Sequence, residues 1–435
     1  MTQQNKDQKV ILTGIKPSGM PHLGNYCGAI KPMVDFINNK KDNETIYCFI
    51  PDIHVVNGGL EPAKIREYSY GMIATYLACG MDPEKVVMFR QSAVRQHAEL
   101  ATMLNNFTPK GMMNRAHSYK AVVDKNKLDD DFGDLKKAKE AFIAILEGRK
   151  ETFTKFHDIL DNLETLDEYI ETITDSNTKE SMDKVLKNFI KIIKRELSHK
   201  DGIDELRDFV SDFLNDAQNQ FHNKYDAGIN MGLYNYPILM AADILLYHTN
   251  TVPVGKDQIQ HIEMARDIAN SFNHRYSETF TLPDYESKED APEISGLDGR
   301  KMSKSYGNHI PMFCNEMELK GLIKKIITDS AKPEEEKDVE NSTLVQLYSL
   351  FADEAKTTDY KQRLAKGGFG YGDAKMELFE VINAELAPKR EIYNELMKDR
   401  KALEAILRDN EEQARRVAEK TMRKVRKKMG LVDVI

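Results

Sequence analysis

Two lysines and two serines alternate around a methionine in the stretch KMSKS, residues 301–305. Gly296, Gly299 and Gly307 flank the stretch, and glycine gives the backbone the freedom that a moving loop needs. Ammonium and hydroxyl groups gathered in one loop can bind an anion, such as the phosphates of a nucleotide. A solvated basic surface loop is the alternative for any single stretch of this kind, so the choice depends on the rest of the chain.

A second candidate anion site lies near the N-terminus, in TGIKPSGMPHLGNYCGAI, residues 13–30. The apolar run at residues 9–15 predicts a buried strand, and a helix is expected from about Tyr26 to Asn38. Backbone N–H groups at the start of a helix attract phosphate, and His22 and Asn25 can add hydrogen bonds there. Capping of that helix is an equally good interpretation of these two side chains taken alone.

The elements around both stretches predict an α/β fold with a parallel sheet. Strand-like runs at ETIYCFIPDIH (44–54) and KVVMFRQS (85–92) enclose a helix-like run at residues 62–80. Further along, a helix is followed by the strand-like TVPVG (251–255), and another helix is expected near Asp257. Strands that alternate with helices form parallel sheets through right-handed crossovers. Such Rossmann-type sheets bind nucleotides at the carboxyl ends of their strands.

The predicted catalytic sheet is split in the sequence. We assign residues 8–126 and 223–314 to a Rossmann-type catalytic domain, 127–222 to a helical insertion, and 315–435 to a helical C-terminal domain. The insertion is rich in charge, contains no proline and repeats apolar residues at helical spacing. The last helix is basic and could contact an RNA backbone or form an ordinary solvated face. Its cations are Arg415, Arg416, Arg423, Lys424, Arg426, Lys427 and Lys428.

Composition narrows the class of protein. With 435 residues, 41% apolar and 30% charged, the chain reads as a globular protein of two or three domains. Its 62 basic and 70 acidic side chains give a net charge of −8, which excludes a wholly basic nucleic-acid binder. The four cysteines have no metal-ligand spacing, so we expect reduced thiols and no structural metal. No apolar run approaches the roughly 18 residues of a membrane span, and we expect a cytoplasmic protein.

Together, PHLGN and KMSKS resemble the two signature motifs of the class I aminoacyl-tRNA synthetases, with Asn25 in place of the second histidine of the first motif. The chain is most similar to the tryptophanyl-tRNA synthetases of that class, through residues 14–32 and 236–273. The resemblance is close over 9–115 and 226–315 and looser in the C-terminal third. It implies a homodimeric tryptophan–tRNA ligase with a helical anticodon-binding domain. Its substrates would be L-tryptophan, ATP with Mg²⁺, and tRNA(Trp).

In that reaction the amino-acid carboxylate attacks the α-phosphate of ATP and pyrophosphate leaves. Cations near the leaving oxygens stabilise the transition state more than the ground state, and no protein nucleophile is needed. The resemblance implies the catalytic residues His22, Asn25, Lys301, Ser303 and Lys304. It implies the ATP-binding residues Lys16, Pro17, Ser18, Gly24, Asn25, Gly255, Lys256, Asp257, Lys301, Met302, Ser303, Lys304 and Ser305. For Asp257, capping of the following helix is the alternative.

Asp243 lies inside the apolar run ILMAADILLY, residues 238–247. A buried carboxylate needs hydrogen-bond donors, and the indole N–H is a donor only, so Asp243 could accept it. A phenol O–H also donates, so Asp243 alone does not separate tryptophan from tyrosine, and bonding to a neighbouring side chain is a further alternative. The resemblance implies a tryptophan pocket of Leu12, His54, Tyr236, Met240, Asp243, Val252, Val254 and Gln258.

Three rival functions stay open at this point. A tyrosine-specific enzyme of the same fold would share both motifs. A synthetase-like regulatory or RNA-binding protein would have no need of a pyrophosphate clamp such as KMSKS. Another nucleotidyl transferase with an H-x-G-N loop would leave the long helical C-terminal region without a role.

Overall fold

The computed structural model describes residues 8–124, 228–287 and 293–431. The chain divides into two compact units, Met1–Ala116 with Met231–Ile435, and His117–Asn230. The first unit holds the sheet and the C-terminal helices. The predicted insertion at 127–222 lies outside the described residues.

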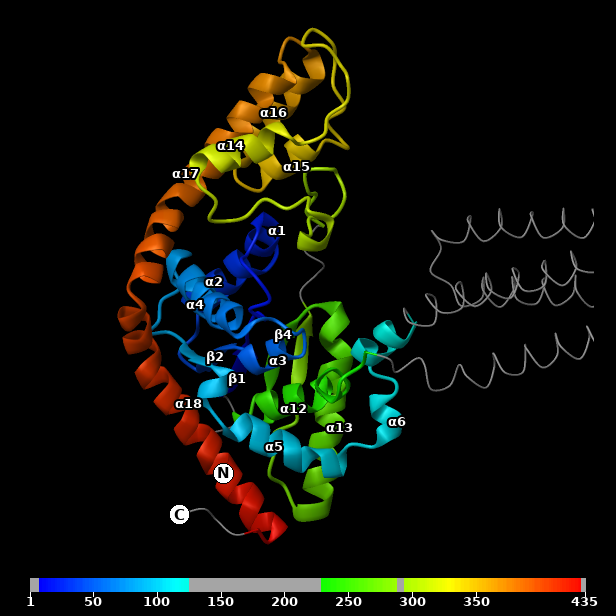
Figure 1. The fold of residues 1–435 in the computed structure, drawn as a ribbon, viewed down its shortest axis with the longest axis vertical. Coiled ribbons are helices and arrows are strands. Elements are labelled where there is room, and N and C mark those ends of the chain that lie inside the picture. The colour runs from blue at the N-terminus through cyan, green and yellow to red at the C-terminus, as the bar shows by residue number, and fades with distance from the viewer. Residues whose placement is uncertain (1–7, 125–227, 288–292, 432–435) are drawn as a thin grey trace, which may run out of the picture. The chain divides into compact units, whose positions relative to one another are not determined.

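Five parallel strands form one sheet in the order β3-β2-β1-β4-β5 in the described residues (Figure 1). They are β1 (Lys9–Thr13), β2 (Glu44–Ile50), β3 (Val87–Arg90), β4 (Thr251–Val254) and β5 (Asp284–Ser287). In β1, Ile11 is paired with Ile46 on one side and Thr251 on the other. The predicted α/β class with a parallel sheet is therefore confirmed, and β1 and β4 end side by side.

One prediction of a strand was wrong in its extent, and one strand was missed. The run ETIYCFIPDIH is not one strand, because β2 ends at Ile50 and the short helix α3 (Asp52–Val56) follows Pro51, whose nitrogen has no hydrogen to donate to a ladder. β5 was not predicted at all. It is a polar edge strand, DYES, whose Tyr285 is exposed, so it has no apolar run to reveal it.

The helix expected after the first motif is present, but its first part is wider than an α-helix. A single α-turn, α1 (Leu23–Asn25), passes into the π-helical η2 (Tyr26–Ile30) and then α2 (Lys31–Asn38). π-helical turns of this kind are rare in proteins overall, and many of those that occur lie at functional sites. This one directly follows the PHLGN stretch.

Helices and short 3₁₀ turns surround the sheet. The helices are α4 (Pro62–Ala78), α5 (Gln96–Leu104), α6 (Lys110–Met113), α11 (Met231–Tyr234), α12 (Tyr236–Leu246) and α13 (Ile259–Tyr276). The 3₁₀ turns are η3 (Gln91–Ala93), η4 (Asn105–Phe107), η6 (Lys256–Gln258) and η7 (Lys304–Tyr306). The apolar helix α12 packs between α5 and α13, so the side chains of its middle are buried. In the described part of the chain, none of the helices has the length and apolarity to span a membrane.

The C-terminal region is helical, as predicted. It contains α14 (Glu316–Lys324), α15 (Thr343–Ser349), α16 (Glu354–Lys366), α17 (Tyr371–Lys398) and α18 (Arg400–Met429). A glycine-rich turn, residues 367–370, separates α16 from α17. α17 packs on α4 and α14, and α18 runs along β3 and α5 (Figure 1). One apolar core joins the sheet to these helices, from Ile11 in β1 to Leu407 in α18.

Arg426 does not belong with the other cations of the last helix. Its side chain is buried, and its guanidinium pairs with Glu99 on α5 at 2.7 Å and with Glu419 at 2.9 Å. Neither of the two roles predicted for these cations, contact with RNA or a place on a solvated face, fits Arg426, because its ion pairs attach α18 to α5. The exposed cations of α18 include Arg416, Arg423 and Lys424.

Candidate active site

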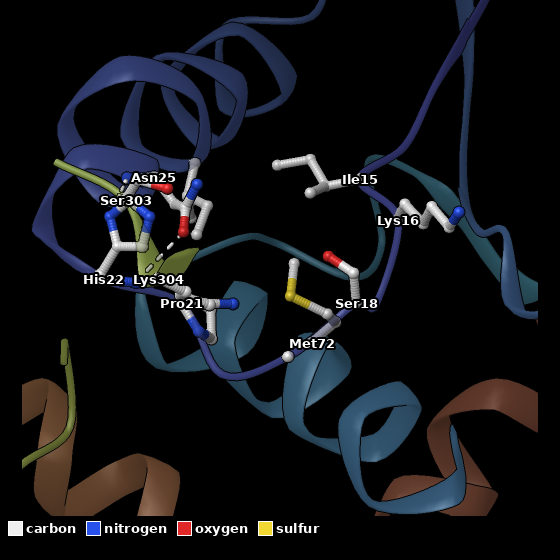
Figure 2. A pocket seen from close by; sticks show the side chains of 11 residues that line it. Ile15, Lys16, Ser18, Pro21, His22, Asn25, Met72, Ser303 and Lys304 are labelled. Carbon is white, nitrogen blue, oxygen red and sulfur yellow. Dashed lines mark hydrogen bonds between the residues drawn. The ribbon is translucent and has the colours of Figure 1, made fainter. Parts of the chain in front are cut away.

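The two candidate anion-binding stretches meet in one pocket (Figure 2). Its lining residues are Ile15, Lys16, Ser18, Gly19, Pro21, His22, Asn25, Ile30, Met72, Ser303 and Lys304. A side chain at position 19 would bring its Cβ within 2.8 Å of the Lys304 Nζ, so glycine there lets the second lysine of KMSKS approach the first stretch. The structure thus brings together residues nearly 300 positions apart in the sequence.

His22 and Asn25 cap the short helix reciprocally. Asn25 N–H donates to His22 Nδ1 at 3.3 Å, and His22 N–H donates to Asn25 Oδ1 at 3.2 Å. The capping interpretation is therefore correct, and it is compatible with a role in binding. Because Nδ1 accepts a hydrogen bond, the proton of the neutral ring is on Nε2, which remains a donor in a side chain that lines the pocket.

The pocket gathers cationic groups without a carboxylate among its lining residues. Burial, together with the nearby charges of Lys304 and His309, lowers the pKa of His22 to about 4. Burial also lowers the pKa of Lys16 and that of Lys304. An anion in the pocket would relieve this repulsion, so the electrostatics favour a phosphate-bearing ligand.

His309 was missed by the sequence analysis. Its ring centroid lies 5.9 Å from that of His22, and its Nδ1 is buried without a hydrogen-bond partner among the described residues. Burial and the charge of Lys304 lower its pKa. A histidine four residues after KMSKS gave no signal by itself, because its proximity to His22 depends on pairing between segments distant in the sequence.

Two side chains hold the KMSKS loop in place. Met302 is 4% exposed and sits in the core, where its sulfur accepts a hydrogen bond of 3.3 Å from Gly24 N–H. Asn308 is 3% exposed, accepts from Ser303 N–H at 2.8 Å and donates to the Lys301 carbonyl at 3.0 Å. Asn308 was also missed, although a polar residue next to an apolar run is a candidate for such a structural bond.

Not all of the glycines around the KMSKS loop are there to give the backbone freedom to move. Gly299 and Gly307 have φ of 80° and 65°, a region that glycine adopts readily. At Gly296 a Cβ would lie 2.5 Å from the Asn308 side chain, so this glycine makes room for the buried amide. The loop therefore has a fixed base at Asn308.

Several predicted nucleotide residues lie outside this pocket's lining. Pro17 and Met302 are buried, whereas Lys301 and Ser305 are exposed. Gly255, Lys256 and Asp257 follow β4, which is the neighbour of β1 in the sheet. Asp257 caps neither η6 nor α13, and its carboxylate accepts from Gln258 Nε2 at 2.7 Å. These three residues are at the edge of the sheet where the strand order allows a nucleotide to bind.

Asp243 is completely buried and carries three hydrogen-bonded partners. Gln91 Nε2 and His97 Nδ1 donate to Oδ1 at 2.7 and 2.6 Å, and His54 Nε2 lies 2.9 Å from Oδ2. Burial alone would raise the pKa of Asp243, but the hydrogen bonds from His54 and His97 outweigh burial and lower it. The carboxylate is therefore ionised and held from three sides. Gln91 and His97 were not predicted; Gln91 directly follows the buried strand β3, which is a signal for a site, whereas His97 lies on α5 and has no such signal.

Aromatic rings extend this cluster. The Tyr236 ring lies 4.4 Å from that of His54 and 5.5 Å from that of His261, whose Nδ1 is 3.0 Å from Gln258 Oε1. The structure therefore connects four predicted pocket residues, His54, Asp243, Tyr236 and Gln258.

The remaining predicted pocket residues are apolar. Leu12 and Val252 are buried in the adjacent strands β1 and β4, while Val254 and Met240 are partly buried in β4 and α12. Among the described residues, no group of three or more His, Cys, Asp or Glu side chains is arranged to hold a metal ion.

Comparison with known proteins gives a consistent result. The family model of class I tRNA synthetases (W and Y) matches residues 4–144 and 196–387. A tryptophan–tRNA ligase of Neisseria meningitidis serogroup A is 36% identical over 98% of this chain and 98% of its own length. One of Xanthomonas axonopodis pv. citri is 37% identical over 98% of this chain and 77% of its own length. A solved tryptophanyl-tRNA synthetase from Campylobacter jejuni, complexed with ADP and tryptophan, has a TM-score of 0.69 and 34% identity, covering 97% of this chain and 100% of that one.

The repulsion in the pocket predicts how His22 titrates. In the protein without ligand its pKa should be about 4, and pyrophosphate should raise it, because negative charge stabilises the imidazolium form. NMR of protein with ¹³C-labelled histidine rings measures both titrations, with the His22 signal identified by its absence in His22→Asn. Sodium chloride of equal ionic strength is the control. A midpoint that pyrophosphate leaves unchanged would contradict the assignment of this pocket to phosphate.

Proposed function

Because the chain belongs to the family of class I tRNA synthetases for tryptophan and tyrosine, we propose that it is a tryptophan–tRNA ligase. It forms tryptophanyl-adenylate from L-tryptophan and ATP, and then transfers the tryptophanyl group to the terminal ribose of tRNA(Trp). The observation that carries this proposal is the meeting of PHLGN and KMSKS in one cationic pocket, in a chain whose full-length relatives are named tryptophan–tRNA ligases.

In this proposal the pocket binds the triphosphate of ATP. Lys304 and Ser303 contact the β- and γ-phosphates, and Lys301 joins them when the loop closes over the nucleotide. His22, through Nε2–H, and Lys16 contact the phosphates from the side of the first stretch. Stabilisation of the departing pyrophosphate by these cations is the main contribution to the rate.

The remaining contacts to the nucleotide follow from the strand order. Gly255 and Asp257 lie after β4, beside the end of β1, and bind the ribose side of ATP. Mg²⁺ arrives bound to the phosphates and needs few protein ligands, which suits a pocket without an acidic cluster.

The amino-acid site lies around Asp243. A carboxylate has about four acceptor positions and three are used here, so Oδ2 can also accept the indole N–H. The Nδ1 of His54 is buried without a hydrogen-bond partner among the described residues, which leaves it for a polar group of the substrate. Tyr236 and Gln258 hold the ammonium and carboxylate ends, and Leu12, Met240, Val252 and Val254 enclose the rings.

The proposal also assigns a role to each domain and an oligomeric state to the protein. Residues 8–126 and 223–314 form the catalytic domain, 127–222 the insertion, and 315–435 the anticodon-binding domain. The exposed cations of α18, such as Arg416 and Arg423, contribute to contact with the tRNA backbone. The protein acts in the cytoplasm as a homodimer.

Amino-acid-dependent exchange of pyrophosphate into ATP tests the activity. We expect exchange with tryptophan and Mg²⁺, and none with the other nineteen amino acids offered separately. Exchange with tyrosine instead would keep the ATP site and overturn the amino-acid pocket. Folded protein that exchanges with none of the twenty would favour a regulatory or RNA-binding protein.

Replacing the buried carboxylate should damage tryptophan use selectively. In Asp243→Asn the kcat/KM for tryptophan should fall by about 100- to 1,000-fold, because the negative charge is lost and the new NH2 group faces donors where a carboxylate oxygen had accepted. The KM for ATP should change little, and the Tm shows whether the variant is folded. Asp284→Asn, an exposed carboxylate at the start of β5, is the matched control. An unchanged kcat/KM for tryptophan would remove Asp243 from the pocket.

The proposed dimer has a direct test. Light scattering after size-exclusion chromatography should give about twice the 49.8 kDa of one chain at micromolar concentration. A mass that stays at one chain under conditions of full exchange activity would show that the monomer is the working form.

A further inference from the structure

Residues 90–97, the coupling segment, lie between helix α18 and the buried carboxylate of Asp243. Arg90 ends β3, the turn η3 follows, and Gln96 begins α5. Some side chains of this segment bond residues around the amino-acid pocket, and others bond α18. The two sets are interleaved along the chain.

On the pocket side, the segment supplies two of the three partners of Asp243. Gln91 Nε2 and His97 Nδ1 both donate to Oδ1, and both side chains are completely buried. Ser92 bonds Asp52 twice, through its hydroxyl and through its N–H at 2.8 Å. Asp52 begins α3, the helix that carries the pocket histidine. The segment thus fixes both the carboxylate and the helix next to it.

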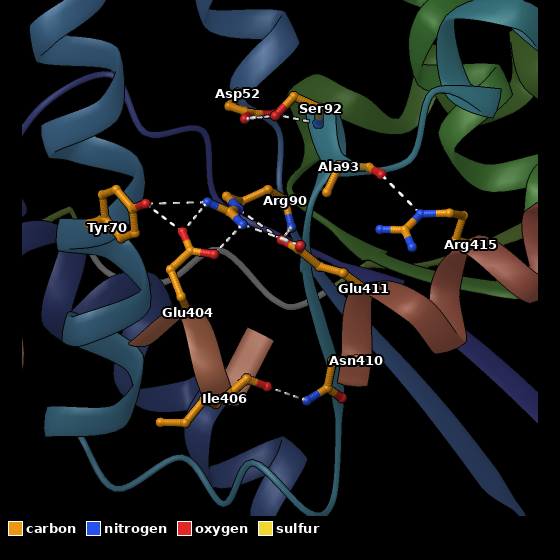
Figure 3. A network of polar contacts seen from close by, with 10 residues as sticks. All are labelled: Asp52, Tyr70, Arg90, Ser92, Ala93, Glu404, Ile406, Asn410, Glu411 and Arg415. Atoms are coloured by element: carbon orange, nitrogen blue, oxygen red, sulfur yellow. Dashed lines mark hydrogen bonds and ion pairs between the residues drawn. The ribbon is translucent and has the colours of Figure 1, made fainter. Parts of the chain in front are cut away.

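On the other side, α18 holds Arg90 with two carboxylates (Figure 3). Nε and Nη2 of Arg90 donate to Glu411 at 2.7 and 3.2 Å, and Nη1 and Nη2 donate to Glu404 at 2.6 and 2.9 Å. The side chains of Arg90 and Glu411 are 20% and 9% exposed, so solvent screens this pair less than a surface ion pair. Bidentate pairs of this kind fix orientation as well as distance.

A second attachment lies about two helical turns further along α18. Gln96 Nε2 donates to Glu419 Oε2 at 2.8 Å, and between the two attachments the Ala93 carbonyl accepts from Arg415 Nε at 3.4 Å. The side chains held by α18 are therefore those of residues 90 and 96. Each directly precedes one of the two donors to Asp243, residues 91 and 97.

We propose that α18 positions both donors of Asp243 by holding the residue before each, and that it thereby tunes the affinity of the pocket for the amino acid. Arg90 and Gln96 are positioning residues in this inference, which rests on the function proposed above. No residue of the coupling segment lines the nucleotide pocket described above, so the effect is confined to the amino acid.

The test uses the full chain with Glu404→Gln and Glu411→Gln combined, which keeps shape and removes the charges that hold Arg90. We expect the KM for tryptophan in pyrophosphate exchange to rise about tenfold, within the range that coupling through packed networks spans. The KM for ATP should change less than about twofold. Asp409→Asn, an exposed carboxylate on the same helix, is the matched control and should leave both KM values unchanged. If the double variant does not fold, Gln96→Met removes only the contact with Glu419.

A double-mutant cycle separates positioning from general stabilisation. In a Gln91→Ala background the Glu404→Gln, Glu411→Gln pair should raise the KM for tryptophan by much less, because one of the donors it acts through is already absent. A lower Tm with unchanged KM for tryptophan would overturn the inference, as would equal rises in both KM values or full additivity in the cycle. Wild-type protein without tryptophan-dependent exchange would instead overturn the proposed function, and equilibrium dialysis of tryptophan would then still report on the pocket.

Discussion

The hydrogen bonds that hold the ionised Asp243 carboxylate are the constraint on which the surrounding structure depends. A carboxylate with no solvent contact is unstable unless donors surround it, and its donors come from three different places: α3, the turn after β3, and α5. Asp243 itself is on α12. Four segments must therefore keep their relative positions for one charge to stay buried, and this requirement organises the packing around the amino-acid pocket.

The cationic pocket differs from the surroundings of Asp243, because it gathers groups of like charge instead of surrounding one charge with hydrogen-bond donors. Lys16, Lys304 and His22 are brought together without a carboxylate lining the pocket; burial lowers the pKa of all three, and the charges of Lys304 and His309 lower that of His22 further. An arrangement that disfavours its own charges must be held by other interactions, and here the buried Met302 and Asn308 hold the loop. Under the proposed function, binding of a polyanion would relieve the repulsion of His22 by its neighbours.

The fold class and four of the five strands of the described sheet could be predicted from the sequence, because each depends on residues close together in the chain. The two candidate anion-binding stretches could be recognised for the same reason. PHLGN and KMSKS carry their glycines and cations within a few positions. The features that were missed depend on contacts between distant segments. His97 looks like any polar residue on a helix until α12 places a carboxylate beside it, and Arg426 looks like one more surface cation until Glu99 pairs with it. No local pattern distinguishes these residues.

The two pockets also differ in whether near or distant segments of the chain support them. The cationic pocket is formed mainly by the two stretches, and residues within or next to them, such as Asn25 and Asn308, hold it in place. The carboxylate of the amino-acid pocket is held by side chains whose neighbours are in turn fastened to α18, more than 300 positions later in the chain. A helix that belongs to the C-terminal region therefore completes the support of a residue on α12. Under the proposed function, the amino-acid site is supported by the whole of this unit, whereas the phosphate site is supported mainly by two short segments.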